Sequence, residues 1–190
     1  LYCDVQSLYP SIMLTFKYFP EVDELNIFHS LLSDLKDFRL NAKEMMSAAK
    51  TKSEEMYYDA LQSTFKVLIN SFYGYLGFAY GHFSDFEEAN KVTAKGREII
   101  KSMIEWLEDN DCKVIEIDTD GIYFVPPGRV KEKKEEEGII TELSSALPEG
   151  INLELAGRYR AMFSYKIKNY VLLDYDDRII IKGSGLRSRG

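Results

Sequence analysis

The 190-residue sequence has little of what zinc sites, disulfide frameworks and membrane spans require. Its two cysteines, Cys3 and Cys112, do not form a C-x-x-C pair, so they offer neither zinc-site spacing nor a disulfide framework. Its two histidines, His29 and His82, have no nucleophile motif near them, which argues against a Ser/His/Asp hydrolase. No apolar run approaches the roughly 18 residues of a membrane span, and no signal peptide is visible. We therefore expect a cytoplasmic protein with no membrane partner.

Charge is distributed unevenly along the chain. The net charge is −7, but the residues from Ala156 onward include eight Lys or Arg against three Asp, so this part carries +5 and the remainder −12. A hydrophobic content of 45% with 13% aromatic residues is enough for a packed core of one domain. An acidic body with a basic end is typical of proteins that hold metal ions in one place and phosphates in another. Because the sequence starts with Leu1 inside an apolar strand, we expect a fragment or split subunit of something longer.

An acidic turn lies between two β-branched segments. Residues 115–124 read I-E-I-D-T-D-G-I-Y-F, which predicts a β-hairpin whose tight turn carries Asp118 and Asp120. Carboxylates two residues apart on an extended chain lean to the same side, where their charges repel unless a cation separates them or one is protonated. A hard divalent ion such as Mg²⁺ is the natural occupant. The alternative is an ordinary exposed turn, in which Asp and Gly are common.

The periodicity of apolar residues predicts an α+β fold. We expect an antiparallel sheet covered by helices on one face, with an inserted two-helix hairpin resembling a finger. The helices are expected over residues 28–50, 54–73 and 85–109, with a charged helix or loop over 130–147 whose residues 131–137 are solvated. Gly96 is expected to allow close packing of its helix on the sheet. The strands are expected over residues 1–5, 115–124 on both sides of the turn, 152–155, 160–166, 169–174 and 178–182.

The helices of the inserted hairpin carry cations at helical spacing. Arg39 and Lys43 lie four residues apart on the first helix, and Lys66, Asn70 and Tyr73 follow an i, i+4, i+7 pattern on the second. Each set therefore occupies one face. Taken alone, basic residues on a helix are most simply explained as a solvated surface.

Three short stretches of the chain combine charged, polar and aromatic residues. Residues 4–11 read D-V-Q-S-L-Y-P-S, residues 66–74 read K-V-L-I-N-S-F-Y-G, and residues 118–121 read D-T-D-G. In this order and spacing they resemble the polymerase module of B-family DNA polymerases, whose motifs are D-x-x-S-L-Y-P-S, K-x-x-x-N-S-x-Y-G and D-T-D-S, or D-T-D-G in archaeal-looking members. Residues 168–170 resemble the later K-x-Y element, and Arg39 with Lys43 resembles the R-x-x-x-K pair of the fingers. The sequence K-G-S-G at 182–185 lacks the Glu of the family's G-x-E turn.

The resemblance implies template-directed DNA synthesis, in which deoxynucleotides are added to a primer 3′-end by two-metal-ion phosphoryl transfer. It implies two Mg²⁺ ions, for which Mn²⁺ can substitute. It also implies a palm at residues 1–20 and 74–190, a fingers insertion at about 21–73, and no exonuclease, N-terminal or thumb domain. The implied partners are primer–template DNA, dNTP, and the remaining polymerase domains or a complementary polymerase subunit.

The resemblance also implies a role for individual residues. Asp4 and Asp120, with the Val5 carbonyl, would be the metal ligands, and Asp118 would be a third catalytic carboxylate that acts electrostatically or indirectly. Tyr9 would lie under the sugar and exclude a 2′-hydroxyl, and Tyr73 would stack near the nascent base pair. The full nucleotide-binding set is Leu8, Tyr9, Arg39, Lys43, Lys66, Asn70 and Tyr73. The DNA-binding set is Gly74, Lys168, Tyr170, Arg187 and Arg189.

Two other functions remain to be compared with DNA synthesis. A catalytically silent polymerase-like module, acting as a scaffold or DNA-binding clamp, would be recognised by a lost carboxylate, whereas Asp4 and Asp120 are both present. A nucleotidyl cyclase with a similar palm would use the same metal chemistry without DNA. The motifs at 4–11 and 66–74 and the basic end of the chain argue against a cyclase.

Overall fold

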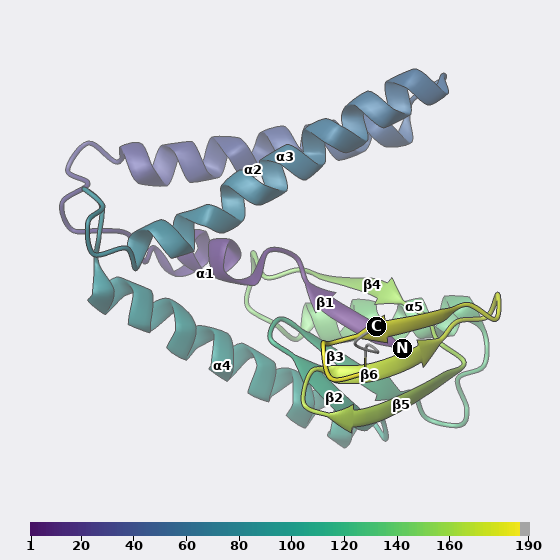
Figure 1. Ribbon diagram of the computed structural model, residues 1–190. Coiled ribbons are helices and arrows are strands. Elements are labelled where there is room, and N and C mark those ends of the chain that lie inside the picture. Colours follow the sequence, from purple (N-terminus) through teal and green to yellow (C-terminus); the bar gives the residue numbers. More distant parts are fainter. Residues whose placement is uncertain (187–190) are drawn as a thin grey trace. The chain divides into compact units, whose positions relative to one another are not determined.

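A computed structural model of the chain describes residues 1–186 and divides the chain into two compact units (Figure 1). The first, called here the sheet unit, consists of Leu1–Gln6 and Glu98–Gly190. The second, the helical unit, consists of Ser7–Arg97. The chain passes between the units twice, directly after the first strand and within the long helix α4 (Phe86–Asp109).

The sheet unit contains two antiparallel sheets. The first has the strand order β2-β3-β1-β4, formed by β1 (Tyr2–Val5), β2 (Lys113–Asp118), β3 (Gly121–Val125) and β4 (Leu153–Gly157). The second has the order β5-β6-β7, formed by β5 (Ala161–Lys166), β6 (Asn169–Leu173) and β7 (Ile179–Lys182). The predicted hairpin around the acidic turn is therefore present as β2 and β3.

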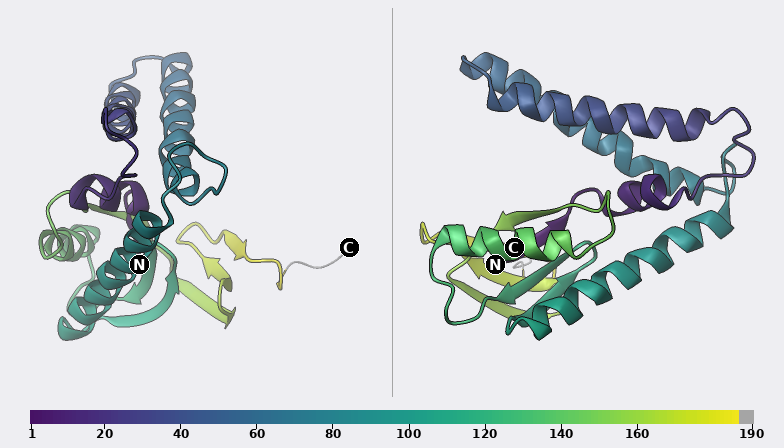
Figure 2. Two further views of the ribbon diagram at one scale, coloured as in Figure 1. Left: turned by 90° about the vertical axis from the view of Figure 1, so that its left-hand side faces the viewer. Right: turned by 180° about the vertical axis from the view of Figure 1, so that it is seen from behind.

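The α+β class is confirmed, but the expectation of a single sheet is wrong. Helix α5 (Lys133–Ser145) and the last turns of α4 cover one face of the four-stranded sheet, and the three-stranded sheet lies on the other side (Figure 2). Tyr123 of β3 packs there against Tyr170 and Leu172 of β6, and all three side chains are at most 4% exposed. Both faces of the four-stranded sheet are thus buried, because β1 and β3 place apolar or aromatic side chains on each.

The helical unit contains α1 (Leu8–Phe16), α2 (Ile27–Ser47), α3 (Lys52–Leu76) and the first turns of α4. Helices α2 and α3 form the expected helical hairpin. The start of α2 is fixed by Asp23, whose carboxylate accepts the amide protons of Ile27 and Phe28 at 2.8 and 2.9 Å. Helix α3 starts with a capping box, in which Thr51 and Glu54 each accept the other's amide proton at 3.2 Å.

Three local interpretations of the sequence need correction. Residues 8–16 form a helix where none was expected, and Pro10 is accommodated because it falls in the first helical turn, where no amide donor is needed. Gly96 packs its helix against α1 and not against a sheet, because a Cβ there would lie 3.2 Å from the Tyr9 ring. Glu136 is 6% exposed rather than solvated, and its carboxylate is paired with Arg158. Within residues 1–186, no helix combines the length and apolar character needed to cross a bilayer.

Candidate active site

The two carboxylates of the acidic turn lie next to the carboxylate of the first strand. Strand register pairs Asp4 of β1 with Gly121 of β3, and Gly121 with Asp118 of β2, so three neighbouring strands contribute to one row. Asp120 immediately precedes Gly121, and its carbonyl oxygen accepts the Val5 amide proton at 2.8 Å. Residues separated by more than a hundred positions are therefore brought together by sheet pairing, as the resemblance requires.

Tyr2 contacts the carboxylate of Asp4. Its hydroxyl donates to Asp4 Oδ1 at 3.2 Å, and its ring stacks on Tyr123 with centroids 4.2 Å apart. Burial raises the pKa of Tyr2, and the negative charges of Asp4 and Asp120 raise it further. Gly121 is required beside it, because a Cβ at that position would lie 2.5 Å from the Tyr2 ring and hydroxyl. Tyr2 thus supplies a neutral hydroxyl close to both of the expected metal ligands.

Asp118 has a different environment from Asp4. Its Oδ2 accepts a hydrogen bond from the Tyr170 hydroxyl at 2.9 Å, and its Oδ1 lies 3.5 Å from Lys168 Nζ. Lys168 also donates to Thr119 Oγ1 at 2.6 Å, which ties the acidic turn to the loop between β5 and β6. Burial raises the pKa of Tyr170, and its bonds to Tyr123 and Asp118 add to this, so it remains a neutral donor. Much of the charge of Asp118 is therefore balanced within the sheet unit.

The donor set suits a hard divalent cation held with substrate or water oxygens. Asp4 of β1 and Asp120 of the β2–β3 turn supply two carboxylates, and Mg²⁺ is commonly bound through one or two protein carboxylates. No group of three or more His, Cys, Asp or Glu side chains arranged to hold a metal occurs among residues 1–186. The residues present fit an ion shared with a phosphate ligand better than a closed structural site.

In the helical unit, Arg39 of α2 is fixed beside the start of α1. Its Nη1 donates to Ser7 Oγ at 3.0 Å, and its buried Nε has no hydrogen-bond partner within the described part of the chain. Ser7 precedes α1 in a left-handed conformation (φ 50°) and gives that helix no side-chain cap. A guanidinium next to uncapped helix amides is a suitable environment for an anion such as a phosphate.

Tyr9 of α1 and Tyr73 of α3 face each other in the helical unit. Their ring centroids lie 4.5 Å apart, with a tilt of 38°. Burial raises the pKa of Tyr73, the nearby Tyr9 raises it further, and Arg97 of α4 lowers it. Leu8 is 4% exposed, so its side chain belongs to the core and only its backbone is suited to contact a nucleotide.

The remaining predicted residues lie on surfaces of the two units. Lys66, Asn70 and Gly74 are exposed on α3, and Lys43 is half-buried on α2. Lys168 is exposed, whereas Tyr170 is 1% exposed. Arg187 and Arg189 lie outside the described residues.

Sequence reasoning missed several partners of these residues. Tyr2 contacts Asp4, and Ser7 accepts a hydrogen bond from Arg39. Arg97 lowers the pKa of Tyr73. Glu116 accepts bonds from the Ser164 hydroxyl at 2.8 Å and the Lys168 amide at 3.4 Å, and so joins β2 to the β5–β6 hairpin. Ser7 lies inside the motif at residues 4–11 and Tyr2 two residues before it, which was the one available signal for these two residues. The contacts of Glu116 and Arg97 depend on the fold.

The chain is similar to known DNA polymerases. The profile of DNA polymerase family B matches residues 16–187. The chain belongs to this family. DNA polymerase 1 of Pyrococcus abyssi (strain GE5 / Orsay) is 32% identical over 203 residues, which cover 95% of this chain and 26% of that protein. The DNA polymerase of Thermococcus gorgonarius is also 32% identical, over 207 residues that cover 96% of this chain and 27% of that protein.

A solved structure shows that the fold is shared as well. The family B DNA polymerase of the hyperthermophilic archaeon Pyrobaculum calidifontis matches 96% of this chain and 26% of its own, with a TM-score of 0.73 and 24% identity. This family B chain therefore spans about a quarter of the length of the relatives it matches. Membership of family B supports the resemblance on which the site residues were chosen, while the role of each residue stays a prediction.

Proposed function

We propose that the chain is the palm and fingers part of a DNA-directed DNA polymerase. The observation that carries the proposal is the row formed by Asp4, Gly121 and Asp118 across three paired strands, with Asp120 in the adjoining turn of a family B chain. Phosphoryl transfer to a primer 3′-oxygen requires closely spaced carboxylates of this kind. In this assignment the sheet unit corresponds to the palm and the α2–α3 hairpin to the fingers.

The residues of the sheet unit have distinct roles in this proposal. Asp4 and Asp120, with the Val5 carbonyl, would hold two Mg²⁺ ions, which supply Lewis-acid stabilisation of the attacking and leaving oxygens. Asp118 sets the local field and the position of the turn, because Lys168 and Tyr170 already engage its carboxylate. Tyr170 supports Asp118 from the core, and Lys168 is the more accessible of the two to DNA.

The helical unit binds the incoming dNTP in this proposal. Arg39, Lys43 and Lys66 neutralise the triphosphate as charge moves to the leaving pyrophosphate, and Asn70 holds the same group through hydrogen bonds. The partly uncapped start of α1 offers the Leu8 amide to a phosphate oxygen. Tyr9, supported by Tyr73, presents its ring to the sugar and leaves no room for a 2′-hydroxyl.

The test uses a chimera, because the chain spans about a quarter of its relatives. This chain would replace the aligned segment of the Thermococcus gorgonarius polymerase, and extension of a primed hairpin with dNTP and Mg²⁺ would be followed. The chimera is expected to extend primers, and Asp120→Asn to lower kcat by at least about a thousandfold through loss of a charged metal ligand. Asp176→Asn in the exposed β6–β7 turn is the matched control and should leave kcat unchanged.

The isolated chain provides a second measurement. Mn²⁺ binding followed by electron paramagnetic resonance should weaken at least about tenfold in Asp4→Asn and in Asp120→Asn, but not in Asp176→Asn. An Asp120→Asn chimera that extends primers at the unsubstituted rate would contradict the metal assignment. A well-folded chimera with no activity and no Mn²⁺ binding would contradict the polymerase proposal itself.

A further inference from the structure

The three-stranded sheet has two apolar faces, and one of them is open. On β6, Tyr170 and Leu172 are buried in the tyrosine cluster, so Val171 and Leu173 point to the opposite side. Register extends this side to the neighbouring strands through the rows Phe163–Val171–Ile181 and Ala161–Leu173–Ile179. We call these six residues the outer face: Ala161, Phe163, Val171, Leu173, Ile179 and Ile181.

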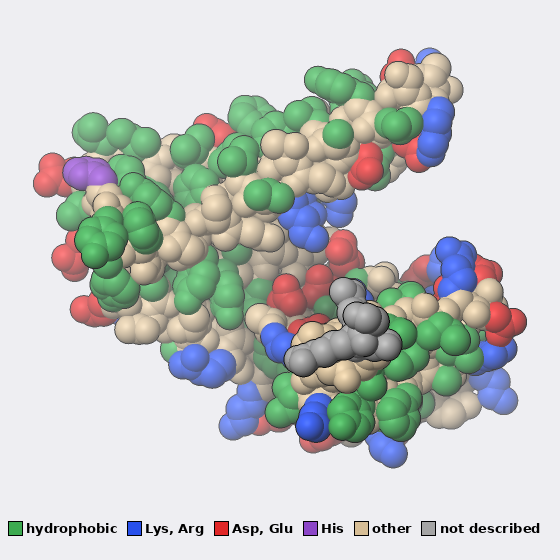
Figure 3. All heavy atoms as spheres, viewed as in Figure 1, with side chains coloured by type: hydrophobic (Ala, Val, Ile, Leu, Met, Phe, Trp, Pro, Cys, Tyr) green, Lys and Arg blue, Asp and Glu red, His purple; other side chains and the backbone are tan. Residues whose placement is uncertain are grey.

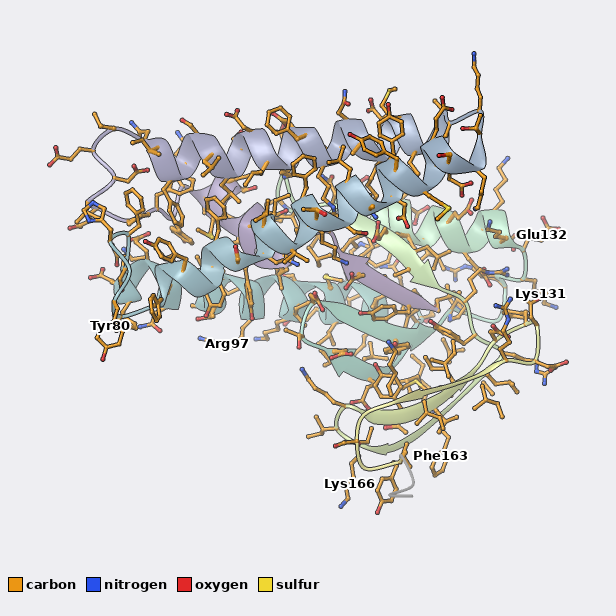
Figure 4. All side chains as sticks on the ribbon, turned by 45° about the horizontal axis from the view of Figure 1, so that its top comes forward. Tyr80, Arg97, Lys131, Glu132, Phe163 and Lys166 are labelled. Atoms are coloured by element: carbon orange, nitrogen blue, oxygen red, sulfur yellow. The ribbon has the colours of Figure 1, made fainter. Side chains whose placement is uncertain are left out.

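The outer face is exposed to an extent that is unusual for such side chains. Phe163 is 62% exposed, Ile179 68% and Ile181 41%, and none of the six residues is charged or polar. Hydrophobic side chains gather over this sheet in the space-filling view (Figure 3), and Phe163 projects outward from β5 (Figure 4). Contiguous exposed apolar surfaces on soluble proteins mark interaction sites.

The two ends of this sheet carry opposite charge. The β5–β6 turn and the end of β7 contain Lys166, Lys168 and Lys182. Lys168 is paired with Asp118, and Glu116 lies beside this turn, where it accepts bonds from the Ser164 hydroxyl and the Lys168 amide, so one positive charge remains at this end. At the other end, the β6–β7 turn contains the three aspartates Asp174, Asp176 and Asp177. Arg160 and Arg178 balance two of these three negative charges, so one negative charge remains.

We propose that the outer face binds the outer face of a second copy of this chain, with the strands of the two sheets running in opposite directions about a two-fold axis. In this arrangement Phe163 and Ile181 of each copy are buried against the partner, with the two sheets about 10 Å apart as in a β-sandwich. The basic end of each copy then lies over the acidic end of the other. Such an interface is self-complementary in shape and charge, and it closes after two copies.

The charge pattern favours an antiparallel second copy over a parallel copy and over a nucleic acid. A parallel arrangement would bring like charges together at both ends, and a nucleic acid would meet negative charge at the Asp176 end. The alternative of edge-to-edge pairing through β5 or β7 would use backbone hydrogen bonds and would not close. The inference does not depend on the proposed polymerase function.

The test is the oligomeric state of the purified 190-residue chain, measured by analytical ultracentrifugation from about 1 to about 100 μM. A monomer–dimer equilibrium is expected. Phe163→Lys should raise the dimer Kd by at least about a hundredfold, because the change occurs twice in a symmetric interface. Met56→Lys on α3 is the matched control, since Met56 is 64% exposed and lies outside the outer face. Circular dichroism checks that both variants are folded.

A charge-exchange series tests the orientation of the two copies. Lys166→Glu should weaken the dimer about tenfold, and adding Asp176→Lys to the same chain should restore it. A wild-type chain that stays monomeric at about 100 μM, or a Phe163→Lys variant that dimerises as well as Met56→Lys, would overturn the proposal. A dimer that the charge exchange does not rescue would overturn the antiparallel arrangement. Species that keep growing with concentration would show edge-to-edge pairing instead.

Discussion

Replacing Tyr170 by Phe removes one hydroxyl from the carboxylate site while keeping the ring. The ring is 1% exposed and packs against Tyr123 with centroids 5.1 Å apart. The hydroxyl donates to Asp118 at 2.9 Å and lies 3.2 Å from the Tyr123 hydroxyl. The substitution therefore isolates the hydrogen bonds of one buried group from its packing.

The size of the effect follows from the surroundings of Asp118. A hydrogen bond to a charged group contributes about 1.5–3 kcal/mol, but the Asp118 side chain is 33% exposed, so water replaces part of the lost bond. We expect Tyr170→Phe to lower the free energy of unfolding by about 1–2 kcal/mol at pH 7, and the Tm by about 2–8 °C. Urea unfolding and calorimetry measure both quantities. Tyr57→Phe, at a position that is 62% exposed, is the control and should change stability by less than about 0.5 kcal/mol.

The same substitution predicts a change in the pH dependence of stability. The pKa of Tyr170 is raised above its ordinary value of about 10, first by burial and then by its bonds to Tyr123 and Asp118. Its contribution is complete below about pH 10, where tyrosine is protonated in both the folded and the unfolded state. As the pH rises further, the unfolded state loses this proton first, and the stability falls by about 1.4 kcal/mol per pH unit.

The Phe variant lacks that titration, so its stability curve should approach that of the wild type above about pH 10. The comparison is made by urea unfolding between about pH 9 and pH 11.5, with Tyr57→Phe measured in parallel. Curves for wild type and Tyr170→Phe that stay parallel over this range would refute the raised pKa. An unchanged stability at pH 7 would refute the hydrogen bond to Asp118.

Three further predictions concern substrate choice, packing and affinity. Tyr9→Ala in the chimera should lower the dNTP-to-rNTP ratio of kcat/KM by at least about tenfold, and an unchanged ratio would show that Tyr9 does not contact the sugar. Gly121→Ala should destabilise the chain by about 1–3 kcal/mol in urea, because its Cβ displaces Tyr2, whereas Gly128→Ala has open space and should be neutral. The isolated chain, with a net charge of −7, should bind a primed hairpin weakly and lose that binding steeply as salt rises; submicromolar affinity at moderate salt in fluorescence anisotropy would contradict this.

The features predicted well from sequence are those that depend on neighbouring residues. The β2–β3 hairpin follows from a turn sequence between β-branched segments, and the helices α2 to α4 follow from apolar periodicity. Their boundaries were within a few residues of those observed. Glu136 shows the limit of this approach. Its position in a run of charged residues predicts a solvated side chain, but the fold pairs it with Arg158, which is distant in the sequence.

The division into two sheets was beyond the reach of local patterns. Residues 161–182 alternate in the way that any strand of a single sheet would, and nothing in that alternation tells which strands continue the first sheet. The outcome depends on Tyr123 and Tyr170, whose rings fill the space between the sheets. Side chains of this size provide enough apolar area to stabilise a second layer, but their partners lie 47 residues apart.

The two aspartates of the acidic turn show why chemistry cannot be assigned from spacing alone. In the sequence Asp118 and Asp120 are equivalent, since they are two residues apart and flank one threonine. Lys168 and Tyr170 follow about fifty residues later in the sequence. In the fold, Lys168 pairs with Asp118 and the Tyr170 hydroxyl donates a hydrogen bond to it. Because a carboxylate that already has a cation and a neutral donor attracts a further cation less strongly, these two contacts weaken Asp118 as a metal ligand. They depend on the three-stranded sheet and on the loop that joins β5 to β6, which no spacing within the acidic turn indicates.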